Sequence, residues 1–213
     1  MIKFSYEPQN FDRLYGTQGF SDELLKNHFA LYQGYVTNTN KLIESLNRMQ
    51  AEGKIEGPEF AELKRRFGWE WNGLRLHELY FGNMTKESDS YEKGSEIIQK
   101  IERDFGSSSE WKKEFKATGA MRGIGWVVLY YDGVRDRLWN AWINEHDAGH
   151  LAGAEPLVIM DVFEHAFMLD YGIKKVGYLD AFFNAICWRK VEERFEKACL
   201  SVEKSVKQAK ATV

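Results

Sequence analysis

The sequence has few cysteines and prolines, and it lacks long apolar runs. Two cysteines and three prolines occur in 213 residues, which excludes a disulfide framework and a thiolate zinc site. No apolar run approaches the roughly 20 residues that a membrane span requires, so no membrane partner is expected. Residues 1–14 also lack the apolar stretch of a signal peptide. Together these features favour a cytoplasmic location.

The sequence also has no excess of charge of one sign. The 29 Lys and Arg residues nearly balance the 32 Asp and Glu residues, which leaves a net charge of −3. Because there is no basic block, a nucleic acid is not expected as a partner. Apolar residues make up 44% and aromatic residues 15% of the chain, including seven tryptophans, which is typical of a globular protein with a dense aromatic core.

The first half of the sequence has the pattern of two long helices. Residues 21–51 open with Ser-Asp-Glu-Leu, which resembles a capping box, and contain no proline. Apolar and aromatic residues recur there at spacings of three and four, as on a helix that packs against another helix. Glycines and Pro58 then interrupt the chain, and a second helix follows with Phe60, His77 and Phe81 on its apolar face. The short break predicts a long antiparallel helical hairpin.

The second half of the sequence mixes helices and strands. We expect helices at about 90–105 and 109–117, strands at 125–131, 137–143 and 156–160, and helices again from residue 162 with interruptions near Gly172 and Gly177. Asp132-Gly133 is a hairpin signal between the first two strands. We therefore predict an α+β fold, in which the hairpin is followed by a small three-stranded antiparallel sheet with flanking helices. The predicted domains are residues 1–88 and 89–213.

Two histidines are expected to face each other inside the helical hairpin. His28 and His77 lie on the two apolar faces at levels that differ by roughly 5 Å, or about one helical turn. Each could be a core histidine with one hydrogen bond. A facing pair of buried imidazoles is costly without a shared partner, however, and a metal ion is a common partner.

A second pair of possible ligands follows the last predicted strand. Asp161 and His165 are four residues apart, so they share a face if the segment is helical, and they can still converge if Asp161 ends the strand. Three imidazoles and one carboxylate form a ligand set without thiolate, which suits Fe or Mn, and also Zn.

Four blocks of the sequence resemble the iron/manganese superoxide dismutase family. Residues 161–171, DVFEHAFMLDY, are similar to the family signature DxWEHAxxLxY, with Phe163 where Trp is usual. Residues 178–188, YLDAFFNAICW, are similar to YLxAFWNxINW, and the resemblance extends through residues 35–40 and 76–81. The resemblance implies the ligands His28, His77, Asp161 and His165, and one Fe or Mn ion per chain. It also implies superoxide as the substrate and a homodimer or homotetramer as the assembly.

Two other functions remain open for such a sequence. A non-haem iron oxygenase would need a facial triad with more than one open position, whereas four protein ligands leave fewer. A non-catalytic metal-binding or structural paralogue on the same scaffold would be expected to lose ligands, and all four residues are present here.

The resemblance also implies roles for residues around the metal. Tyr35 corresponds to a gateway tyrosine, but it follows His28 by seven residues rather than eight, and Tyr32 is the candidate for the place of a histidine that the family has between them. Gly73 stands where many iron enzymes have Gln. We assign His146 to the hydrogen bond with a solvent molecule on the metal, with Glu145 as the alternative.

The remaining assignments concern the pocket wall and its surroundings. Glu164 corresponds to a glutamate that reaches across a dimer interface, and Met168 replaces an interface tyrosine. Lys175 corresponds to a basic residue near the substrate funnel, where a cation could steer an anion. His150 is left as a surface or structural residue. The residues expected to line a dry metal pocket are Phe81, Trp126, Phe163 and Trp188.

Overall fold

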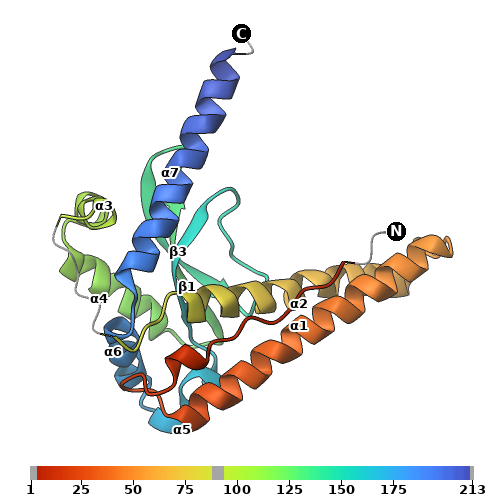
Figure 1. Ribbon diagram of the computed structural model, residues 1–213, viewed down its shortest axis with the longest axis horizontal. Helices are drawn as coiled ribbons and strands as arrows, with labels where there is room; N and C mark the ends of the chain where they lie inside the picture. The colour runs from red at the N-terminus through yellow and green to blue at the C-terminus, as the bar shows by residue number, and fades with distance from the viewer. Residues whose placement is uncertain (1–3, 88–93, 212–213) are drawn as a thin grey trace.

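The computed structural model describes residues 4–87 and 94–211, and its first half is the predicted helical hairpin. Helix α1 spans Asp22–Ala51 and helix α2 spans Pro58–Gly82. The Ser21 hydroxyl caps α1 by accepting the Leu24 N–H, and a proline begins α2, where its missing N–H costs nothing. Figure 1 shows the two helices running side by side as one long arm.

A three-stranded antiparallel sheet forms the centre of the second half. The strands are β1 (Gly125–Asp132), β2 (Arg137–Asn144) and β3 (Glu155–Asp161), in the order β2-β1-β3. The register pairs Trp126 with Ile143 on one side and with Asp161 on the other. The predicted fold class is therefore confirmed, and Asp161 is the last residue of a strand rather than the first of a helix.

Helices flank the sheet on both sides (Figure 1). They are α3 (Glu96–Phe105), α4 (Ser108–Gly119), α5 (Met168–Tyr171), α6 (Lys175–Asn184) and α7 (Trp188–Ala211), with short 3-10 turns at Asp12–Leu14 and Glu164–Ala166. The predicted helix start near Ser90 and the predicted domain boundary at residue 88 lie outside the described residues. No helix in the described part of the chain is long and apolar enough to span a membrane.

The helix expected from residue 162 begins instead with a short 3-10 turn, and the interruption expected near Gly172 is present. The turn at Glu164–Ala166 ends at Phe167, whose φ of −145° is not helical, and α5 ends after four residues at Gly172, which has φ +53°. His165 lies in this short turn, and its Nε2 is 3.1 Å from Oδ2 of Asp161.

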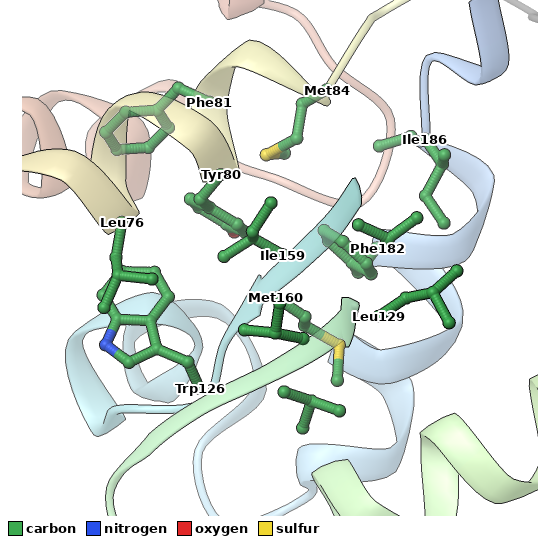
Figure 2. Close-up of a cluster of buried hydrophobic side chains, with 14 of the residues drawn as sticks. Leu76, Tyr80, Phe81, Met84, Trp126, Leu129, Ile159, Met160, Phe182 and Ile186 are labelled. Carbon is green, nitrogen blue, oxygen red and sulfur yellow. The ribbon is translucent and has the colours of Figure 1, made fainter. Parts of the chain in front are cut away.

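A buried cluster joins the hairpin to the sheet. Figure 2 shows Leu76 and Tyr80 of α2 facing Trp126 of β1 and Ile159 of β3, with Phe182 of α6 beside them. The sheet residues Trp126 and Ile159 are fully buried. Because this apolar layer holds α2 against β1 and β3, it fixes the distance between the histidine of α2 and the carboxylate at the end of β3.

Candidate metal centre

Four side chains from both halves of the chain converge at one point. His28 comes from α1, His77 from α2, Asp161 from the end of β3 and His165 from the turn that follows. One ligand atom from each residue lies within 4.8 Å of the others. The Nε2 atoms of His28 and His165 are each 3.1 Å from Oδ2 of Asp161, and that of His77 is 3.6 Å away.

The hydrogen bonds of His77 show that this group fits a cation. Its Nδ1 lies 2.6 Å from the carbonyl oxygen of Gly73, so Nδ1 carries the proton and Nε2 presents a lone pair. That buried Nε2 has no hydrogen-bond partner and faces the Asp161 carboxylate. Two electron-rich atoms would repel each other there, whereas a metal ion bound by both would be stabilised.

The charges of the group agree with metal binding. Burial lowers the pKa of His28 and holds the pKa of His77 well below its ordinary value. Burial acts to raise the pKa of Asp161, but His165 and His28 outweigh it and lower that pKa below its usual range. An ionised carboxylate at Asp161 and neutral rings at His28 and His77 are the protonation states in which these groups bind metals.

Hydrogen bonds from neighbouring residues hold both the side chain and the main chain of Asp161. Its second carboxylate oxygen, Oδ1, accepts the N–H of Phe163 at 2.8 Å, and its main-chain oxygen accepts the hydroxyl of Tyr178 at 2.5 Å. The hydroxyl of Tyr80 lies 3.2 Å from that of Tyr178. Tyr80 and Tyr178 were not singled out from the sequence, because their apolar surroundings are also those of ordinary core aromatics.

Tyr35 and His146 form a hydrogen-bonded pair beside the four ligands. Tyr35 Oη lies 2.7 Å from His146 Nε2, and the indole N–H of Trp126 donates to His146 Nδ1 at 3.0 Å. Burial lowers the pKa of His146 to about 4, so the ring is neutral near pH 7. Because Nδ1 accepts, Nε2 carries the proton and donates to the tyrosine oxygen. The hydroxyl proton of Tyr35 is then available to another acceptor.

His146 points into the site, where it contacts Tyr35 and Trp126. Glu145 has φ +50°, a left-handed conformation that is uncommon for a residue with a side chain. His146 follows it and is completely buried. His150, expected to be a surface or structural residue, holds this loop, because its Nε2 donates to the main-chain oxygen of His146 and its Nδ1 lies 2.9 Å from Tyr130 Oη.

Gly73 is needed for close packing of Tyr35. A Cβ at Gly73 would lie 2.5 Å from Cδ1 and 2.7 Å from Cε1 of the Tyr35 ring. The ring also stacks on His77, with centroids 5.2 Å apart. Tyr32, by contrast, turns its hydroxyl away from this pair, since it donates to Glu78 at 3.0 Å and accepts the N–H of Gln9 at 2.9 Å.

Aromatic rings enclose the ligands. Trp126 meets His77 edge to face at 4.9 Å, Phe81 meets His28 at 4.9 Å, and Phe163 stacks on His165 at 5.2 Å. Trp69 was missed in the sequence, although its ring lies 4.8 Å from that of His146. The spacing of four residues from Trp69 to Gly73 and again to His77 places the three on one face of α2 and was the available signal.

Trp188 has an aromatic ring contact in the second half of the chain. Its ring packs against Trp111 of α4 at 5.6 Å, at the start of α7. Three other predicted residues lie near the surface. Glu164 and Met168 are exposed, and the ammonium of Lys175 donates to the main-chain oxygen of Met121 at 3.3 Å while lying over the Phe167 ring.

Comparison with known proteins identifies the family. The model for "Iron/manganese superoxide dismutases, C-terminal domain" matches residues 92–194. The chain is 36% identical to the iron superoxide dismutase of Aquifex pyrophilus, over 92% of this chain and 94% of that protein. The chain belongs to the iron/manganese superoxide dismutase family. It is also 34% identical to the manganese superoxide dismutase of Haloarcula marismortui, over 90% of this chain and 92% of that protein.

Proposed function

We propose that this member of the superoxide dismutase family converts two superoxide ions and two protons into dioxygen and hydrogen peroxide. The observation that carries the proposal is the convergence of His28, His77, Asp161 and His165, whose ligand atoms lie within 4.8 Å of one another. One Fe or Mn ion bound there would supply a one-electron redox couple, which zinc does not provide. Relatives named for iron and for manganese are about equally similar, so we propose that either ion can be bound.

Two side chains of the protein would act on the substrate, Tyr35 as a proton donor and Lys175 through its charge. Tyr35 accepts a hydrogen bond from His146, so its own hydroxyl proton can be donated towards the substrate. Burial raises the pKa of Tyr35 above its ordinary value, which keeps that proton in place near neutral pH. Lys175 has no carboxylate partner among the described residues, and we propose that its charge attracts the anionic substrate.

Metal analysis combined with turnover tests this function. The chain is purified, stripped of metal and reconstituted separately with Fe and with Mn. We expect about one ion per chain and superoxide disproportionation that survives cyanide, with at least one of the two metals. A sample with full metal content and no turnover with either metal would favour the non-catalytic alternative and refute the proposal.

We further propose a dimer formed through the surface around His165. Glu164 is exposed and has no hydrogen-bond partner among the described residues. Large apolar side chains lie nearby on the surface, with Ile173 92%, Val176 62% and Leu169 53% exposed, a grouping that often marks an interface. In analytical ultracentrifugation we expect Ile173→Asp to dissociate the dimer, whereas Val134→Asp, at an 85% exposed site elsewhere, should not. A wild-type monomer would contradict this.

We propose that the chain has two domains, residues 1–88 and residues 89–213, and a cytoplasmic location. Residues 1–88 would supply His28 and His77, and residues 89–213 would supply Asp161 and His165, so that the ion would join the two parts. The two cysteines are not joined by a disulfide, which supports the proposed cytoplasmic location.

A further inference from the structure

A cavity of about 420 Å³ lies between α2, β3 and α7, away from the metal ligands. Leu76 and Leu79 of α2, Pro156 of β3, Ala198 of α7 and Leu151 of the β2–β3 loop contribute to its wall. Figure 1 shows α7 rising steeply from the body, with the β2–β3 loop in the space between α7 and α2. None of the four metal ligands lines it, so the cavity is separate from the proposed active site.

The wall of this cavity can bind an apolar body. Besides the aliphatic side chains, the rings of Trp71 and Tyr130 line it. Both rings are held in place by hydrogen bonds. The Trp71 indole N–H donates to Tyr6 Oη, and the Tyr130 hydroxyl is hydrogen-bonded to His150 Nδ1. A volume of this size, with mostly apolar walls and a few fixed polar groups, is typical of sites for small organic molecules.

The charge of the wall favours an anion. Arg194 donates to the main-chain oxygens of Leu157 and Leu79, each at 2.8 Å, and forms no salt bridge with any residue that the structure describes. The Asn83 side-chain oxygen is a third acceptor, 3.4 Å from Nη1, and none of these three acceptors carries a charge that would neutralise the guanidinium. Burial lowers the pKa of Arg194 to about 10, so the guanidinium remains charged at neutral pH.

Two further cations line the same cavity. Lys197 follows Arg194 by three residues on α7, which places both on one face of the helix, and it has no salt-bridge partner in the described part of the chain. Arg75 is paired with Glu78. Glu155 is the only acidic side chain among the described residues of the wall.

We propose that this cavity binds a small organic anion with an apolar body, such as a medium-chain carboxylate. The anionic group lies at Arg194 and Lys197, and the apolar body lies against Trp71, Leu76 and Leu151. The apolar wall distinguishes this ligand from inorganic phosphate, which would leave that surface without a partner. The experiment below measures ligand binding and not superoxide turnover, so its result can be distinguished from a failure of the proposed dismutase function.

Fluorescence of anilinonaphthalene sulfonate, an aromatic anion, tests the site in the full-length, metal-loaded protein. Leu151→Trp fills the cavity from a loop position that is 36% exposed, and Lys197→Glu reverses one of its charges. Val134→Trp and Lys113→Glu are the matched controls, since Val134 is 85% exposed and the Lys113 side chain is 78% exposed, and neither lines the cavity. Circular dichroism and metal content verify that each variant is folded.

We expect saturable binding of one probe per chain and its displacement by octanoate. Each cavity variant should weaken binding by about tenfold or more, equivalent to about 1.4 kcal/mol, while both controls bind like the wild type. The proposal is overturned if no saturable binding occurs, or if both cavity variants bind like the controls. Displacement by inorganic phosphate as effective as that by octanoate would refute the requirement for an apolar body.

Discussion

Replacement of Gly73 by alanine is expected to disturb the Tyr35–His146 pair without touching either residue. The added Cβ would lie 2.5 Å from the Tyr35 ring, about 1 Å closer than carbon atoms pack. The ring must therefore move by a distance that is large compared with the tolerance of its 2.7 Å hydrogen bond to His146. After such a displacement the Tyr35 oxygen would no longer accept the hydrogen bond from His146 Nε2 with good geometry.

The magnitude follows from comparison with Gly68 in the same helix. At Gly68 an added Cβ meets nothing within 4 Å, so Gly68→Ala should stabilise α2 by roughly 0.5–1 kcal/mol through helix propensity alone. Gly73→Ala gains the same propensity but suffers an overpacking cost of about 1–3 kcal/mol. The two variants should therefore differ by about 1–3 kcal/mol in unfolding free energy, with Gly73→Ala the less stable.

Urea unfolding of the two variants and superoxide turnover at matched metal content form the assay. We expect Gly73→Ala to lose turnover as well as stability, and Gly68→Ala to retain the turnover of the wild type. If Gly73→Ala matches Gly68→Ala in both measurements, Tyr35 does not need the space at Gly73, and the reasoning from close packing is wrong.

Three further predictions concern histidines. His77→Ala removes a ligand and leaves room for solvent, so bound metal should fall well below one ion per chain by elemental analysis; unchanged metal content would contradict the site. The pKa of His146 is lowered from 6.5 to about 4 by burial, so the unfolded chain takes up a proton first as the pH falls. The unfolding free energy of metal-free protein should therefore drop between about pH 6.5 and pH 4, by up to about 3 kcal/mol, and His146→Gln should flatten that fall; an equal slope in both proteins would refute it. His150→Leu should cost about 1–3 kcal/mol by leaving the Tyr130 hydroxyl and the His146 carbonyl unpaired, whereas His150→Gln should recover most of it in urea unfolding; identical losses would show that hydrogen bonding is not the cause.

The contrast between His77 and Trp188 shows which site residues local patterns can predict. The position of His77 follows from helical periodicity, because residues at spacings of three and four share a face whatever the rest of the chain does. Trp188 was assigned by its neighbours in sequence alone. Its ring contacts that of Trp111, more than 70 residues away in the chain, and no local pattern encodes this contact.

The sequence alone predicted most of the elements and the four candidate ligands. Periodicity placed His28 and His77 on facing surfaces of a hairpin, and the β-forming residues before Asp132-Gly133 and the alternation after it predicted the first two strands. Only the tertiary structure decided the hydrogen-bond partners, such as Trp126 for His146. It also decided the close packing, such as that of the Tyr35 ring against Gly73. The physical reason is range. Backbone periodicity arises from neighbouring residues, whereas directed hydrogen bonds and close packing depend on atoms that only the folded chain brings together.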